Sequence, residues 1–189
     1  MNNLLYGQTA YLCGPIDRVA DGGMSWRRDM ATFLEDLGVI PLDPLNKPTR
    51  VGLEDLERRD VRKTWKASGL YDQVADQMKL IRAIDLRLVD LAHFLIVNID
   101  LDVHLAGSYE ELFWSNRQKR PVLLHVKQGK MECPDWLFGV LPHEHIFGSW
   151  EELKTYLVNI DSGLDTRHFK RWILFDYKSM VPKIPYGGE

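Results

Sequence analysis

Residues 93–111 read HFLIVNIDLDVHLAGSYEE, and this stretch carries the strongest indication of the fold. Its first seven residues are almost continuously apolar, which is typical of a β-strand covered on both faces in a parallel sheet. Residues 108–119, which follow a short loop, have the pattern of a helix. A strand that leads through a loop into a helix is one unit of an α/β fold, in which ligands bind beyond the carboxyl ends of the strands.

The same alternation of strand and helix runs through most of the chain. Further apolar runs predict strands at residues 9–13, 39–42, 121–126 and 145–147. Helical spacing of apolar residues, or a charged segment of helical length, predicts helices at 25–37, 53–65, 73–91 and 150–158. We therefore expect a doubly wound, Rossmann-like and flavodoxin-like α/β fold, with a parallel five-stranded sheet flanked by helices.

Length and composition predict one domain with an apolar tail. A chain of 189 residues suffices for one hydrophobic core and leaves little room for a second. We expect the α/β domain to occupy residues 1–160. The tail at residues 161–189 is rich in aromatic and aliphatic side chains, so we expect it to pack on the domain or on another subunit. A homo-oligomer is the expected assembly.

Several classes of protein are disfavoured by the composition. No apolar run approaches the roughly 20 residues that span a bilayer, and the first residues lack the pattern of a signal peptide, so we expect a cytoplasmic protein without membrane contact. The net charge of −3 and the scattered basic residues disfavour a polymeric nucleic acid as partner. The two cysteines and six histidines show no ligand spacing typical of zinc, and no metal or organic cofactor is expected.

The predicted strand ends place a group of residues at the ligand-binding edge of the sheet. They lie after the strands at 9–13 and 39–42 and in the loop that follows residue 99. We expect these residues to contact the substrate: Gly14, Pro15, Asp43, Asp102, Gly107 and Ser108.

The spacing Gly107-Ser108-x-x-Glu111 sets a carboxylate close to the start of a helix at this edge. The positive end of the helix dipole favours an ionised carboxylate, which suits a nucleophile. The alternative is a capping box, in which Ser108 and Glu111 only stabilise the helix start. Glu110 lies roughly 100° from Glu111 around the helix, so only one of them is expected to face a ligand.

Two further residues are candidates for the site, each with a structural alternative. Tyr11 brings an aromatic hydroxyl close to the first strand end, but it could equally be a core aromatic. Asp85 lies within the apolar stripe of a predicted helix, where an unpaired carboxylate is costly to bury. It therefore either lies on the solvent face beside Arg82 or points into a pocket.

Together these segments resemble the nucleoside 2-deoxyribosyltransferase family. The resemblance rests on Y-L-C-G-P-I at residues 11–16, on Asp85 upstream of Asp90, on HFLIVNI, on G-S-x-x-E and on PVLLHV, and it covers roughly residues 9–126. It implies a small-molecule nucleoside or nucleotide and a free nucleobase as partners, in nucleotide salvage. It also implies that Glu111 attacks C1′ of the deoxyribose and forms a covalent sugar ester, while Asp85 protonates the departing base. Tyr11 then corresponds to the tyrosine that orients the nucleophile, and Gly14 to the turn that admits the sugar.

The sequence departs from the family pattern at one position and leaves other functions open. Many relatives carry an acidic residue six positions before the nucleophile, where this chain has Leu105, so Asp100 or Asp102 would have to substitute for it. One alternative is a nucleoside 5′-monophosphate N-glycosidase, with the phosphate held near residues 17–23 by Arg18, Ser25 or Arg27. Another is a nucleotide-binding module without catalysis.

Overall fold

The computed structural model describes residues 3–47, 52, 54, 56–165 and 171–172. Five strands form one parallel sheet in the order β2-β1-β3-β4-β5. The strands are β1 (Thr9–Cys13), β2 (Ile40–Leu42), β3 (Phe94–Ile99), β4 (Val122–Val126) and β5 (Ile146–Phe147). This is the flavodoxin-like order, and it confirms the expected doubly wound α/β fold.

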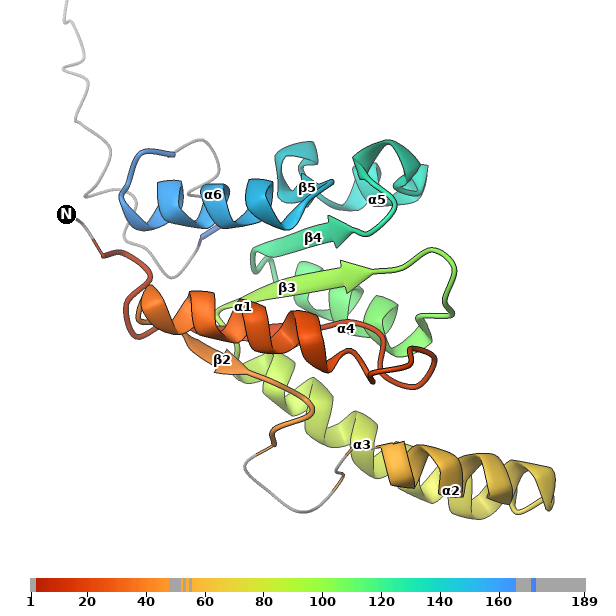
Figure 1. The fold of residues 1–189 in the computed structure, drawn as a ribbon. Helices are drawn as coiled ribbons and strands as arrows, with labels where there is room; N and C mark the ends of the chain where they lie inside the picture. Colours follow the sequence, from red (N-terminus) through yellow and green to blue (C-terminus); the bar gives the residue numbers. More distant parts are fainter. Residues whose placement is uncertain (1–2, 48–51, 53, 55, 166–170, 173–189) are drawn as a thin grey trace, which may run out of the picture.

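Helices cover both faces of the sheet (Figure 1). The helices are α1 (Met24–Asp36), α2 (Leu56–Ala67), α3 (Tyr71–Leu91), α4 (Ala106–Arg117), α5 (Asp135–Val140) and α6 (Trp150–Asp161). Helices α1 and α6 pack on one face, and α3, α4 and α5 pack on the other. Helix α5 was not predicted, because a single short turn of apolar residues has no distinguishing period.

The alternation of side chains along β1 divides the core between the two faces. Ala10 and Leu12 point into the core beneath α1 and α6, whereas Tyr11 and Cys13 point toward α3 and α4. All six residues of β3 are buried, as expected of a central strand in a parallel sheet. The aromatic side chain at position 11 thus emerges on the same side as the helices that carry Asp85 and Glu111.

One aromatic residue of the apolar tail packs on the domain. Trp172 is fully buried, lies 5.1 Å from Phe94 between ring centroids, and donates a hydrogen bond of 3.1 Å from Nε1 to the hydroxyl of Tyr156. Residues 166–170 and 173–189 of the tail, and with them the expected contact with another subunit, lie outside the described residues.

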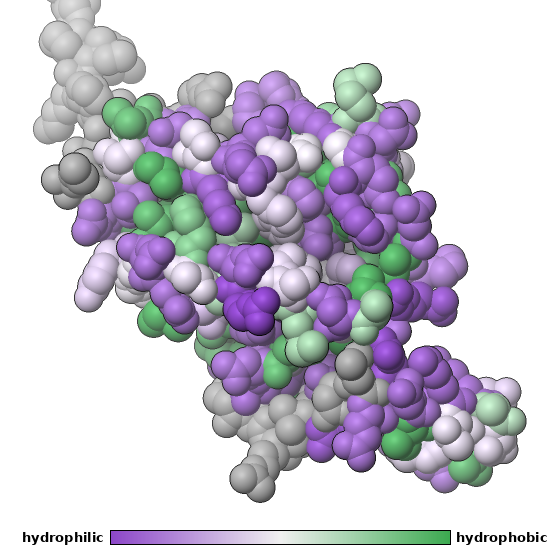
Figure 2. All heavy atoms as spheres, in the orientation of Figure 1, coloured by the Kyte–Doolittle hydropathy of each residue, from purple (hydrophilic) through white to green (hydrophobic). Residues whose placement is uncertain are grey.

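The visible surface of the domain is mainly hydrophilic, with hydrophobic residues scattered over it (Figure 2). Helix α2 and the first half of α3 form a hairpin that extends beyond the sheet (Figure 1). None of the described helices is both long enough and apolar enough to cross a membrane.

Candidate active site

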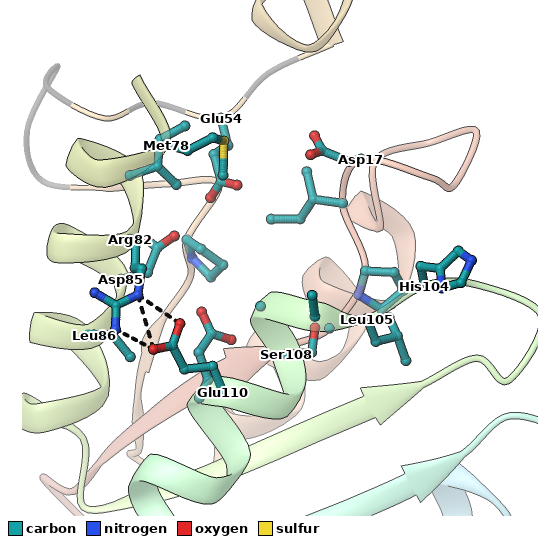
Figure 3. Close-up of a pocket in the computed structure, with 18 of the residues that line it drawn as sticks. Asp17, Glu54, Met78, Arg82, Asp85, Leu86, His104, Leu105, Ser108 and Glu110 are labelled. Carbon is teal, nitrogen blue, oxygen red and sulfur yellow. Dashed lines mark hydrogen bonds and ion pairs between the residues drawn. The ribbon is translucent and has the colours of Figure 1, made fainter. Parts of the chain in front are cut away.

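A cavity of about 490 Å³ lies at the carboxyl edge of the sheet, and its size suits a small-molecule ligand. Its walls come from the loop after β1, from α3 and from the first two turns of α4 (Figure 3). Of the predicted site residues, the structure brings seven together in this cavity: Tyr11, Gly14, Pro15, Asp85, Gly107, Ser108 and Glu111.

Glu111 meets the hydroxyl of Tyr11 inside the cavity. Tyr11, fully buried on β1, donates a hydrogen bond of 2.9 Å from its hydroxyl to Glu111 Oε1. Burial raises the pKa of Glu111, and the neighbouring side chains of Cys13 and Tyr11 partly counteract this rise. The hydroxyl therefore both orients the carboxylate and stabilises its ionised form.

Asp85 reaches the same cavity from α3 and carries the more strongly shifted pKa. Burial and the negative charge of Glu54 raise its pKa to about 8, against the opposing effect of Lys47. Lys47 Nζ lies 2.6 Å from Asp85 Oδ1. Of the two placements left open for Asp85, the structure shows the one in a pocket and not the one on the solvent face beside Arg82, because only 6% of Asp85 is exposed and it lies against Lys47.

Burial raises the pKa of both carboxyl groups, but their nearest neighbours differ. Glu111 receives a hydrogen bond that favours its charge, whereas Asp85 faces a neighbouring carboxylate that opposes its charge. A pair of acidic groups whose surroundings separate their protonation in this way is typical of nucleophile and general acid.

The capping box expected as the alternative for Ser108 and Glu111 is absent. Helix α4 begins at Ala106, two residues earlier than predicted, and its N-cap residue Leu105 makes no side-chain hydrogen bond to the helix. Glu111 is thus the sixth residue of the helix. Because the helix dipole acts mainly within the first turn, the pKa of Glu111 is governed instead by burial and by the side chains of Cys13 and Tyr11.

Glu110 also lines the cavity, which contradicts the expectation that only one of the adjacent glutamates faces it. The separation of the two residues around the helix does not keep Glu110 out of the cavity, because Arg82 on α3 binds its side chain, with Arg82 Nε 2.8 Å from Glu110 Oε2 (Figure 3). This ion pair bridges α3 and α4 and lowers the pKa of Glu110. The negative charge of Glu110 is therefore paired with Arg82, whereas Glu111 accepts a hydrogen bond from the neutral hydroxyl of Tyr11.

Two predicted substrate contacts, Asp43 and Asp102, do not line the cavity. The carboxylate of Asp43 accepts a hydrogen bond of 2.9 Å from the backbone N–H of Leu45. Asp102 is exposed and accepts a hydrogen bond of 3.1 Å from Gln128 Nε2. Both carboxylates stabilise loops at the same edge of the sheet.

Neither Asp100 nor Asp102 supplies an acidic side chain to the cavity wall beside Leu105. The buried carboxylate of Asp100 lies 2.6 Å from Lys127 Nζ and 2.8 Å from Gln128 Nε2, and it does not line the cavity. Leu105 itself does line the cavity (Figure 3). The wall beside Ser108 is therefore apolar where an acidic side chain was expected.

Gly14 is required by packing behind the cavity wall. A Cβ at this position would lie 2.9 Å from the ring of Trp26 and 3.1 Å from the carbonyl oxygen of Asn98. A Cβ at Gly107 would instead meet open space. The first glycine thus lets the loop after β1 lie close to β3, and this brings the loop to the cavity edge.

Arg27, considered above as a phosphate ligand, is instead a buried support of the loop after β1. Only 1% of it is exposed, and its guanidinium donates to the carbonyl oxygens of Gly14 at 2.8 Å and Gly23 at 3.0 Å. It also donates to Leu12, Pro15 and Gly22. The hydroxyl of Ser25 is likewise occupied, because it donates to Asp21 at 2.6 Å. Neither side chain is free to bind a phosphate.

Replacing Arg27 by methionine is expected to lower the free energy of unfolding by about 3 kcal/mol or more, because buried carbonyl groups lose a charged donor. Urea denaturation measures this loss. The matched variant is Arg28→Met, whose side chain is 80% exposed and whose expected loss is within about 0.5 kcal/mol. Equal losses in the two variants would contradict the structural role of Arg27.

Among the described residues, no group of three or more His, Cys, Asp or Glu side chains is arranged to hold a metal ion. No model of a protein family matches the sequence, and no curated protein matches it.

Solved structures show similarities of fold to this chain. A 2-deoxyribosyltransferase from the psychrotolerant bacterium Bacillus psychrosaccharolyticus has a TM-score of 0.51 and 19% identity, covering 77% of this chain and 90% of that chain. A 2-deoxyribosyltransferase from Leishmania mexicana has a TM-score of 0.49 and 15% identity, covering 80% and 97%. A CMP N-glycosidase from Clostridium botulinum has a TM-score of 0.46 and 13% identity, covering 81% and 99%. The chain therefore shares the fold of the nucleoside 2-deoxyribosyltransferases, the family that its sequence resembles.

Proposed function

We propose that the protein exchanges the base of a 2′-deoxyribonucleoside, with Glu111 as nucleophile and Asp85 as general acid. The observation that carries the proposal is the meeting of these two carboxyl groups in one cavity, where Glu111 accepts a hydrogen bond from Tyr11 and Asp85 lies beside Lys47 with its pKa raised to about 8. The fold shared with a 2-deoxyribosyltransferase is compatible with this chemistry.

The reaction consists of two displacements at C1′. In the first, Glu111 Oε attacks C1′, the bond from C1′ to the base nitrogen breaks, and the proton of Asp85 passes to the departing base. In the second, a nitrogen of the incoming base attacks C1′, the ester bond to Glu111 breaks, and Asp85 regains a proton from that base. The enzyme thereby returns to its starting protonation state.

The charges around the cavity favour a neutral nucleoside over a monophosphate. Among the described residues, five acidic side chains line the cavity against two basic ones, Lys79 and Arg82. Arg82 is paired with Glu110, and Lys79 Nζ lies 3.1 Å from Asp76. A phosphate would therefore meet mainly like charge, which speaks against the monophosphate N-glycosidase.

A product analysis separates the three candidate functions. The protein is incubated with a deoxynucleoside or its 5′-monophosphate, with and without a second free base, and the products are separated by chromatography. A new nucleoside that forms only with the second base supports the proposal. Free sugar formed without it indicates a hydrolase, and the absence of reaction with every donor indicates a binding module.

Replacing Tyr11 by phenylalanine is expected to lower kcat by about 10- to 100-fold, which is the loss of one hydrogen bond to a charged group. The pKa of Glu111 should rise without this donor. Activity, which needs the ionised carboxylate, should therefore begin to fall at a higher pH when the solution is made more acidic. The pH dependence of kcat measures both effects. Tyr109→Phe, on α4 but outside the cavity lining, is the matched control, and an equal loss there would contradict the role of Tyr11.

A further inference from the structure

Lys47 contacts the general acid from behind the cavity wall. Its side chain is fully buried, in the loop after β2, and its Nζ lies 2.6 Å from Asp85 Oδ1 and 3.2 Å from Glu54 Oε2. The same ammonium donates a hydrogen bond of 2.7 Å to the carbonyl oxygen of Gly52. One buried cation thus joins α3 to the two sides of the loop between β2 and α2.

This arrangement goes beyond a simple ion pair, because one ammonium serves two carboxylates. A buried lysine needs a partner to keep its charge, and a single carboxylate would satisfy that need. Here Glu54 and Asp85 compete for the same cation, and both also line the cavity. How strongly Lys47 stabilises the ionised form of Asp85 therefore depends on Glu54.

We propose that Lys47 is a positioning residue of the active site, which holds the carboxyl group of Asp85 toward the substrate and sets its protonation jointly with Glu54. The inference rests on the proposed function of Asp85. The ammonium of Lys47, 2.6 Å from Asp85 Oδ1, is the contact that fixes this oxygen. No pattern of spacing in the sequence marks Lys47 as part of the site.

The charged and titratable groups facing Asp85 come from three elements, the loop between β2 and α2, helix α4 and strand β1. Lys47 favours its charged form, whereas Glu54 and, more weakly, Glu111 oppose it. Tyr11 on β1 also lies near enough to interact with Asp85 electrostatically. The two residues of the loop between β2 and α2 therefore act in opposite directions, and their substitution should move the titration of Asp85 in opposite directions.

The test compares Lys47→Met with Glu54→Gln. We expect the pH at which Asp85 loses its proton to rise by about one unit or more in Lys47→Met and to fall in Glu54→Gln. In Lys47→Met, kcat at neutral pH should fall about 10- to 100-fold with less than about a threefold change in KM, because the acid is no longer held in place. The matched control is Lys63→Met, whose side chain is 64% exposed and outside the cavity, with an expected change in kcat of less than about twofold.

The titration is read by carbon-13 NMR of aspartate carboxyl groups, with the Asp85 signal assigned by its loss in Asp85→Asn. This measurement needs no turnover, so it remains decisive for Lys47 even if Glu111 proves not to be the nucleophile. If Lys47→Met does not fold, the double variant with Glu54→Gln removes both charges together, and its titration should return close to that of the unaltered protein. An unmoved titration in Lys47→Met, a shift in the same direction as in Glu54→Gln, or an unchanged kcat would overturn the proposal.

Discussion

Replacing Glu111 by glutamine is expected to lower kcat for base exchange by about 10⁴-fold or more, the largest effect of any single substitution in this site. Glutamine keeps a side-chain oxygen for the hydroxyl of Tyr11 but has no carboxylate to attack C1′. The fold should be retained, because the hydrogen bond from Tyr11 still has an acceptor. Initial rates of base exchange measure the loss, and the melting temperature checks the fold.

The adjacent glutamate provides the control for this prediction. Glu110 also lines the cavity but is paired with Arg82, so Glu110→Gln is expected to lower kcat by less than about tenfold. If Glu111→Gln retained most of its turnover while Glu110→Gln lost it, the assignment of the two glutamates would be reversed.

Replacing Asp85 by asparagine is expected to lower kcat by about 10²- to 10⁴-fold, the usual contribution of a general acid. With the pKa of Asp85 near 8, the unaltered protein should lose activity as the pH rises through about 8, because the acid then loses its proton. This loss should disappear in Asp85→Asn, and pH profiles of kcat for the two proteins test the difference.

The choice of leaving group adds an independent check on Asp85. A nucleoside whose base departs without protonation does not need the general acid, so its rate should fall much less in Asp85→Asn. An equal fall for bases that need protonation and bases that do not would indicate that Asp85 has another role. The same conclusion, that Asp85 has another role, would follow if Asp85→Asn still lost activity as the pH rises through about 8.

Much of the fold could be predicted because the decisive segments have local patterns. Residues 93–99 are continuously apolar, and β3 (Phe94–Ile99) is buried throughout. Gly38 ends the predicted helix at 25–37, and α1 (Met24–Asp36) ends close to it. The ends of these two elements can be predicted because the spacing of apolar residues and the position of a glycine are both visible in the sequence.

The site could be predicted only in part, because its remaining members depend on contacts between distant segments. Lys47 and Asp85 are far apart in the sequence, and nothing in the loop after β2 marks the lysine as buried. The buried position of Arg27 is visible in the sequence, because Arg27 lies three residues before Met30 on the apolar face of its helix. A charged residue on the buried face of a helix needs polar partners. For Arg27 these partners include the backbone carbonyl oxygens of Gly14 and Gly23.

The capping box shows why a local motif can mislead. Ser108 and Glu111 have the correct spacing, but the helix begins two residues earlier than the motif requires. Glu111 is then held by Tyr11 from the neighbouring strand rather than by the helix start. The start of a helix depends on the loop that precedes it, and this loop is held by a hydrogen bond within it, from Asp102 to Asp100, and by one from Gln128 after β4.

The central claim is that the sugar is transferred through an ester with Glu111, and mass spectrometry of the protein tests it directly. The protein is mixed with a deoxynucleoside in the absence of a second base, quenched in acid and measured intact, then digested to locate the adduct. The account predicts a gain of one deoxyribosyl group on the peptide that contains Glu111, which a second base removes and which Glu111→Gln lacks. Turnover without any adduct, or an adduct on another residue, would contradict it.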